Sequence, residues 1–253
     1  MEKTRGLSRH KTTWIMTIMI LFVAGIQEAE ATKKVYSPHV EKGEWEIETR
    51  GSYDFDDRSS KSDKVKEKFA IGYGVTDYWL TEFYGQIERG ASEEDFDFTE
   101  WEWENRFELT EPGEFWVDVG LYVAYELKNG QDKSDKMEGK ILLEKSFGKF
   151  KHRANINFEQ EVGGDRTSND LEGGFAWLTR YKLTKLVQPG VEYYIDFGSF
   201  QEGNSYDEQT HQLGPVLHGK MGHVEYDVGY LFGLTDPAPE GSLKWILEYE
   251  WEF

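Results

Sequence analysis

The chain has 253 residues, with 29 lysine and arginine residues against 48 aspartate and glutamate residues, and a formal net charge of −19 at pH 7. This acidic balance argues against a protein that holds nucleic acid by neutralising phosphates, and the absence of cysteine excludes a disulfide framework. Aromatic residues make up 15% of the chain and glycine occurs 26 times, a composition that favours β-structure over a helical protein.

A secretory signal peptide is predicted at the amino terminus. Four basic residues precede an apolar run over 14–26, and Ala29-Glu30-Ala31 follows that run. A basic region, a short apolar core and a small-residue site are typical of a signal peptide. The alternative is an uncleaved anchor, but the run is short of the ~20 residues that a spanning helix needs. We expect cleavage after Ala31, a mature chain of 32–253, and an extension over 32–43 before the first strand.

From residue 44 onward, the chain divides into twelve segments in which apolar and polar side chains alternate. A period of two places each kind of side chain on its own face of a β-strand. The tenth segment is the weakest, because Pro215 lies inside it and cannot donate to a ladder. The segments before the terminal one are 44–55, 64–75, 78–88, 96–109, 114–127, 137–147, 150–162, 171–183, 189–200, 210–218 and 223–234.

The connectors between these segments alternate in length. Connectors after the even-numbered segments are short or marked by turn residues, and they are 76–77, 110–113, 148–149, 184–188 and 219–222. Connectors after the odd-numbered segments are longer and more polar, and they are 56–63, 89–95, 128–136, 163–170, 201–209 and 235–241. This asymmetry predicts an all-β fold, a transmembrane antiparallel up-and-down β-barrel of twelve strands over 44–253. A soluble lipocalin-like barrel is the alternative, but it would carry its apolar residues inside and would usually have about eight strands.

The terminal segment alternates without a break to the last residue. One face carries Leu243, Trp245, Leu247, Tyr249, Trp251 and Phe253. A last strand that ends in an aromatic residue resembles the assembly signal of Gram-negative outer-membrane β-barrels of the small porin or channel type, and Tyr249, Trp251 and Phe253 carry the resemblance. The resemblance implies a bacterial outer-membrane location, insertion by the barrel-assembly machinery, and contact with outer-membrane lipid and lipopolysaccharide. The asymmetry of the connectors and the even number of strands place the short turns, both termini and the extension 32–43 on the periplasmic side.

The inward face is expected to line a lumen with two charged walls. Small inward residues such as Gly72, Gly74 and Gly120 favour an open or partly open lumen, although glycine also eases barrel curvature. The acidic candidates for selectivity are Glu44, Glu46, Glu48, Glu100, Glu102, Glu104, Glu108, Glu248, Glu250 and Glu252. The basic candidates, on the seventh and eighth segments opposite the first, are Lys151, Arg153, Arg180 and Lys182. This arrangement resembles the transverse charges of diffusion porins, and the alternative is ion pairing that only keeps the lumen wet.

No catalytic residue, cofactor or metal ligand set is expected. No histidine has a serine two residues later, which is the pattern of outer-membrane phospholipases and lipid A deacylases. The five methionines and six histidines are not clustered, and the acidic loop residues lack the spacing of a known calcium loop.

The sequence therefore predicts a monomeric outer-membrane channel for passive diffusion of small hydrophilic solutes, with cations favoured. Two alternatives remain open. The first is a non-conducting barrel that acts as a surface receptor, adhesin or envelope structural protein, and the second is an outer-membrane enzyme. Known twelve-stranded channels for acidic oligosaccharides line their pores with basic residues, and the acidic inward face of this chain departs from that pattern.

Overall fold

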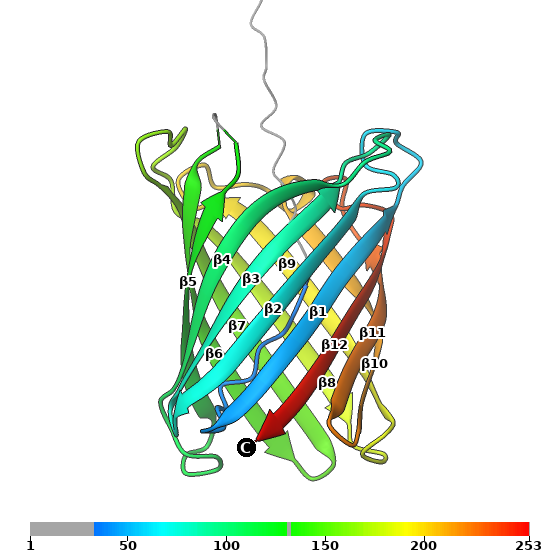
Figure 1. Cartoon of the computed structure of the whole chain (residues 1–253). Helices are drawn as coiled ribbons and strands as arrows, with labels where there is room; N and C mark the ends of the chain where they lie inside the picture. Colours follow the sequence, from blue (N-terminus) through cyan, green and yellow to red (C-terminus); the bar gives the residue numbers. More distant parts are fainter. Residues whose placement is uncertain (1–32, 131–132, 253) are drawn as a thin grey trace, which may run out of the picture.

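The computed structural model describes residues 33–130 and 133–252, which form a closed barrel of twelve antiparallel strands (Figure 1). Each strand pairs with its neighbours in sequence, and β1 closes the barrel on β12. The predicted fold class is confirmed. The expected signal peptide and Phe253 lie outside the described residues. The strands are β1 Glu44–Phe55, β2 Val65–Thr76, β3 Trp79–Arg89, β4 Asp97–Glu108, β5 Asp118–Lys128, β6 Asp135–Phe147, β7 Phe150–Val162, β8 Glu172–Tyr181, β9 Gln188–Ser199, β10 Thr210–Met221, β11 Val224–Gly233 and β12 Gly241–Glu252.

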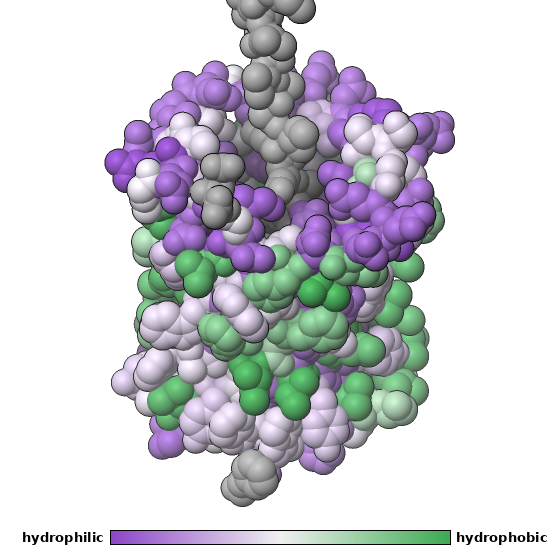
Figure 2. All heavy atoms as spheres, turned by 45° about the horizontal axis from the view of Figure 1, so that its top comes forward, coloured by the Kyte–Doolittle hydropathy of each residue, from purple (hydrophilic) through white to green (hydrophobic). Residues whose placement is uncertain are grey.

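The apolar face of the strands points outward. Phe69, Ile71, Phe83 and Trp103 are about half exposed. The residues directly before and after each of them along the strand point into the barrel and are buried. Figure 2 shows a belt of apolar side chains around the barrel beneath a hydrophilic rim at the end of the longer loops. Within the described residues, no helix has the length and apolar character required to cross a membrane. An apolar outer belt with a polar interior is the inverse of a soluble barrel.

β5 starts later than the sequence predicts, at Asp118 rather than at 114. The apolar alternation continues back through Phe115 and Val117, but local hydrogen bonds hold this stretch in a connector. Gly113 has a φ of 77° and its N–H donates to the Asp118 carboxylate, while the Val119 N–H donates to the Thr110 hydroxyl. The expected short turn over 110–113 is therefore a longer connector over 109–117.

β10 continues through Pro215 to Met221, beyond the predicted end at 218. Pro215 stays in register with Val191 of β9, but the ladder from β10 to β11 is interrupted at Gly214 and Pro215. A Cβ on Gly214 would lie 1.8 Å from the carbonyl oxygen of Tyr230. Glycine therefore allows the two strands to approach at the position where proline removes a donor.

The two ends of the barrel differ in their connections. Tight turns over 77–78, 148–149 and 222–223 lie at the end where β1 begins and β12 stops, here called the short-turn end. At the opposite end, the loop-side end, the β1–β2 loop is fastened to the β11–β12 loop. Arg58 binds Asp56 and donates to the carbonyl oxygens of Asp236 and Ala238, and Lys61 donates to the carbonyl oxygen of Pro237.

Candidate functional site

Residues 33–42, here called the N-terminal plug, run through the barrel interior before β1 begins at the short-turn end (Figure 1). A periplasmic extension was expected over 32–43, and the structure instead places its described part in the lumen. Val35 and Tyr36 are almost completely buried. Val35 packs with Leu178, Val216 and other apolar residues of β8–β11, whereas Tyr36 packs with apolar residues of β5 and β6. Consecutive plug residues therefore contact different walls.

Inward glycines make room for the plug. A Cβ on Gly120 of β5 would lie 2.8 Å from Cβ of Pro38. A Cβ on Gly74 of β2 would lie 1.8 Å from the carbonyl oxygen of Glu41, and the Gly43 N–H donates to the Gly74 carbonyl at 2.8 Å. The small inward residues that favoured an open lumen therefore accommodate the protein's own amino-terminal segment at these two positions.

Polar contacts hold the plug along its length. The Tyr36 N–H donates to Asn155 Oδ1 at 2.7 Å, and Asn155 Nδ2 donates to the Tyr36 carbonyl at 3.1 Å. Nearer the short-turn end, the Ser37 hydroxyl donates to Glu144 at 3.1 Å and the Val40 N–H donates to Glu108 at 2.8 Å. Because water can replace each of these bonds, the plug is held by interactions that are weak individually.

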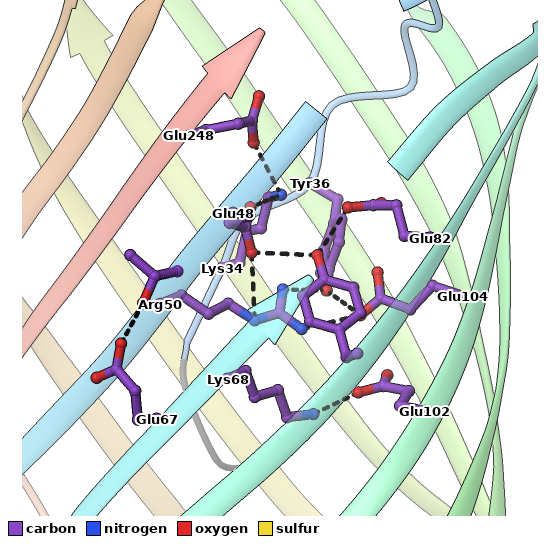
Figure 3. A network of polar contacts seen from close by, with 12 residues as sticks. Lys34, Tyr36, Glu48, Arg50, Glu67, Lys68, Glu82, Glu102, Glu104 and Glu248 are labelled. Carbon is purple, nitrogen blue, oxygen red and sulfur yellow. Dashed lines mark hydrogen bonds and ion pairs between the residues drawn. The ribbon is translucent and has the colours of Figure 1, made fainter. Parts of the chain in front are cut away.

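A charged network lies around Tyr36 in the middle of the barrel (Figure 3). Arg50 of β1 donates to the Tyr36 hydroxyl at 2.5 Å and to Glu104 of β4 at 2.8 Å. The Tyr84 hydroxyl donates to Glu82 at 2.7 Å and lies 3.1 Å from Glu48. The network is completed by ion pairs of Lys34 with Glu48 and Glu248, and of Lys68 with Glu100 and Glu102.

This network changes the expected charge pattern. Glu48, Glu100, Glu102 and Glu104 are all at most 2% exposed, and each has a basic partner close by. The partners are Arg50 of β1, Lys68 of β2, Lys128 of β5 and Lys34 of the plug. They offset the cost of a buried carboxylate without a counter-charge. These four carboxylates therefore belong to an ion-paired interior and form no open acidic surface.

A cavity of about 660 Å³ lies on the short-turn side of the network, and we call it the vestibule. Its acidic wall consists of Glu44, Glu46, Glu248 and Glu250 on β1 and β12. In the strand register Glu46 lies opposite Glu250, and Glu44 lies opposite Glu252. Its basic wall consists of Lys151, Arg153 and Arg180 on β7 and β8, which lie across the ring from β1. The structure therefore brings acidic and basic members of the predicted set to opposite sides of one cavity.

The two walls differ in how their charges are balanced. Lys151 and Arg153 both pair with Glu144 of β6, at 2.5 and 2.6 Å. Arg180 makes no ion pair within 4.0 Å among the described residues, and its Nε is buried without a hydrogen-bond partner. On the acidic wall Glu250 pairs with Lys220, Glu248 with Lys34 and Glu46 with Arg106, whereas Glu44 makes no ion pair within 4.0 Å among the described residues. The vestibule thus retains charge on both sides and is lined for water rather than for an apolar ligand.

The lumen is closed between the vestibule and the loop-side end. Tyr84, Tyr122, Leu142 and Leu178 are fully buried in this central section. A second cavity, near the loop-side end, measures only about 70 Å³ and is lined mainly by charged residues together with Tyr36. The predicted open lumen is therefore observed only at the short-turn end, because the plug and these large inward side chains fill the middle.

Three of the remaining candidate residues lie outside the vestibule wall. Glu108 ends β4 and binds the plug. Glu252 is exposed at the last position of β12, and Lys182 is exposed just beyond the end of β8. Of the assembly-signal residues, Tyr249 is 47% exposed and its ring lies 5.7 Å from that of Trp251.

The basic partners of the acidic strands and the whole of the plug were not predicted from the sequence. Arg50 and Lys68 occupy inward positions of β1 and β2 and lie opposite each other in the register, so the alternation itself marked them as lumen residues. Arg106 of β4, which lies 3.4 Å from Glu82 and 3.6 Å from Glu46, carries the same signal. The plug has no comparable periodicity. The only indication of the plug in the sequence was the row of inward glycines, which leave space in the lumen that no predicted segment fills.

Comparison with solved structures shows the same fold in an outer-membrane channel from Pseudomonas putida F1. The two chains share 12% sequence identity, with a TM-score of 0.65, and the match covers 88% of this chain and 100% of that chain. A bacterial polysaccharide outer membrane secretin matches at a TM-score of 0.43 and 10% identity, over 84% of this chain and 99% of its own. No family model matches the sequence, and no curated protein matches it. The likeness to the channel at this identity is one of fold.

Proposed function

We propose that this protein is a bacterial outer-membrane channel for small hydrophilic solutes, closed by its N-terminal plug in the conformation described. The observation that carries the proposal is the vestibule lined by charged residues, which ends at a plug held by hydrogen bonds and ion pairs. A barrel that served only as a scaffold could fill its interior with wall side chains alone. Here a segment outside the strand ladder completes the closure together with inward wall side chains, so a conducting state requires that this segment withdraw.

The charge distribution supports a preference for cations. At the short-turn rim, oxygens of Glu41, Glu44 and Glu252 lie within 4.8 Å of one another, and the acidic wall continues from this rim into the vestibule. Crowded carboxylates on low-dielectric walls concentrate cations and repel anions, most strongly at low ionic strength. The basic wall would then orient solutes that carry both charges.

The proposal includes an orientation and a route of assembly. The outer apolar belt would contact outer-membrane lipid and lipopolysaccharide, with the short-turn end in the periplasm. The outward aromatics of β12 would be recognised by the barrel-assembly machinery, and the barrel would act as a monomer without catalytic activity. A non-conducting envelope barrel is the second candidate, and the buried central section favours it.

Two glycine substitutions test the gating proposal. In Gly120→Val the new side chain overlaps Pro38 of the plug, whereas in Gly139→Val the nearest atom to the new Cβ is 3.9 Å away. We expect liposomes that contain the Gly120→Val protein to swell faster in small sugars or amino acids than liposomes with the parent or Gly139→Val. Equal rates for all three proteins, with both variants folded as heat-modifiable barrels, would count against plug gating and favour the non-conducting barrel.

A further inference from the structure

A second cluster of ionisable residues, separate from the central network, lies in the wall formed by β9, β10 and β11. Glu192, His218 and Asp227 come from these three strands, and one potential ligand atom from each lies within 4.8 Å of the others. His218 lies directly opposite Asp227 in the strand register. All three residues are at most 8% exposed, so these polar groups have little access to bulk water.

Each member of the cluster has one buried atom without a hydrogen-bond partner among the described residues. These atoms are Glu192 Oε1, His218 Nε2 and Asp227 Oδ1. Buried polar atoms are nearly always satisfied, and a set of three without partners that occur together indicates a binding site. Two carboxylate oxygens and an imidazole nitrogen are acceptors that all attract a cation.

The other atoms of these side chains are already engaged in a way that leaves the free atoms available. Glu192 Oε2 accepts from Lys244 at 2.6 Å and from the Tyr194 hydroxyl at 2.9 Å. Asp227 Oδ2 accepts from Lys244 at 3.2 Å and lies 3.3 Å from His218 Nδ1. His218 Nε2 makes no hydrogen bond within the described residues, so its lone pair is available to a cation when the ring is neutral and its proton is on Nδ1.

The spacing suits a metal ion better than a direct hydrogen bond. His218 Nε2 lies 3.7 Å from Glu192 Oε1, too far for a hydrogen bond. With bonds of about 2.1 Å, two ligands of a tetrahedral zinc ion lie about 3.4 Å apart. A shift of a few tenths of an ångström would therefore bring both atoms onto one ion, with water completing the coordination.

The surroundings make the cluster accessible and partly balanced in charge. His218 and Asp227 line the vestibule, so an ion can reach them from the short-turn end. Lys244 crosses from β12 over Gly229, where a Cβ would lie 3.3 Å from its Cγ. Lys244 is the one lysine that pairs with the two carboxylates among the described residues, and Arg180, which lines the same vestibule, adds positive charge nearby.

We propose that Glu192, His218 and Asp227 bind a divalent first-row transition-metal cation, with zinc as the test ion. Imidazole favours zinc and its neighbours over calcium and magnesium, which prefer all-oxygen sites. The chain contains no cysteine that could compete for the metal. The proposal departs from the sequence-based expectation, which included no metal ligands, and it is independent of whether the barrel conducts.

The test is calorimetric titration of the purified full barrel with Zn²⁺, together with absorption spectra after loading with Co²⁺. We expect saturable binding of one zinc ion, unaffected by excess Mg²⁺, and a Co²⁺ spectrum of four or five ligands. His218→Gln should weaken zinc binding by at least about 100-fold, since even outer-shell changes cost 10–100-fold. The matched control is His152→Gln, on the outward face of β7 beside Thr179, which should bind zinc like the parent.

Three results would overturn the proposal: no saturable zinc binding by the parent, equal zinc binding in His218→Gln, or loss of binding in the control. If His218→Gln fails to give a heat-modifiable barrel, Glu192→Gln replaces it with the same expectation. If neither variant folds, X-ray absorption of the zinc-loaded parent decides. One imidazole among oxygen ligands supports the site, and no imidazole or more than one contradicts it.

Discussion

Replacement of Tyr36 by alanine should release the N-terminal plug. The side chain is 2% exposed and packs against Tyr122, with ring centroids 4.9 Å apart. Its hydroxyl donates to Glu104 at 2.9 Å and accepts from Arg50 at 2.5 Å. The backbone bonds to Asn155 do not depend on the side chain and remain in the variant. Tyr36→Ala therefore removes the ring packing on Tyr122 and the hydroxyl contacts with Glu104 and Arg50, and it leaves the backbone anchor.

The magnitude follows from these contacts. Truncation of a buried aromatic side chain to alanine costs about 3–5 kcal/mol in a protein core. Docking of the plug should weaken by a similar amount, which corresponds to roughly 100- to 5,000-fold in the ratio of released to docked plug. Tyr36→Phe keeps the ring and loses only the hydroxyl, so it should lose about 1.5–3 kcal/mol, the range for hydrogen bonds to charged groups.

The assay is the rate at which a cysteine at position 37 reacts with a water-soluble thiol reagent, measured with bilayer conductance on the same proteins. The Ser37 hydroxyl binds Glu144 beside the vestibule, so labelling should be slow in the parent and much faster with Tyr36→Ala. Tyr125→Ala is the matched control, because Tyr125 faces outward and is 39% exposed. Unchanged labelling and conductance in a folded Tyr36→Ala barrel would refute the account of how the plug is held.

Four further outcomes are expected. Conversion of the four acidic-wall carboxylates to glutamine should lower cation-over-anion selectivity, measured by reversal potential, with a larger effect at ~0.05 M than at ~1 M salt; an anion preference in the parent would contradict this. On whole cells, an impermeant reagent should label a cysteine at Ser60 and not one at Asp77, and the reverse pattern would invert the orientation. Hydrogen bonds from Arg58 lower the pKa of Asp56 to about 2; the loop contacts should therefore hold above the ordinary aspartate pKa and weaken as pH falls through about 2. A nitroxide spin label at position 60 should become more mobile as the loop loosens, and in Asp56→Asn it should be mobile at every pH. Equal label mobility in the parent and in Asp56→Asn at neutral pH would refute the role of Asp56. Alanine at both outward aromatics near the end of β12 should reduce the amount of heat-modifiable barrel in the outer membrane, and an unchanged amount would count against the assembly signal.

The strands could be predicted from the sequence because their outward residues are mainly large and apolar, whereas their inward residues are mainly charged, polar or small. β1 and β7 have the predicted bounds. The error at β5 arose because Phe115 and Val117 imitate a strand, whereas Gly113 and Asp118 direct the backbone into a turn. Alternation reports which face a residue lies on, and local hydrogen bonds decide where a strand begins.

The lumen could be predicted only in part. The opposed walls of the vestibule followed from the strand order, since β1 and β7 must face each other in a ring of twelve. The position of Tyr36 beside Arg50 and Glu104 depends on the plug entering the barrel. A segment without periodicity gives no pattern from which its course can be inferred, so the closed state was not predicted.

Closure of a conducting barrel by its own amino-terminal segment can be measured in a planar bilayer. The experiment compares the single-channel conductance of a variant that lacks residues 33–41 with that of the parent in the same bilayer. We expect the parent to conduct rarely or weakly, and the deletion variant to open persistently with a several-fold larger, cation-selective conductance. If both proteins are inserted and folded yet neither conducts, the plug is not a gate and the barrel is not a channel.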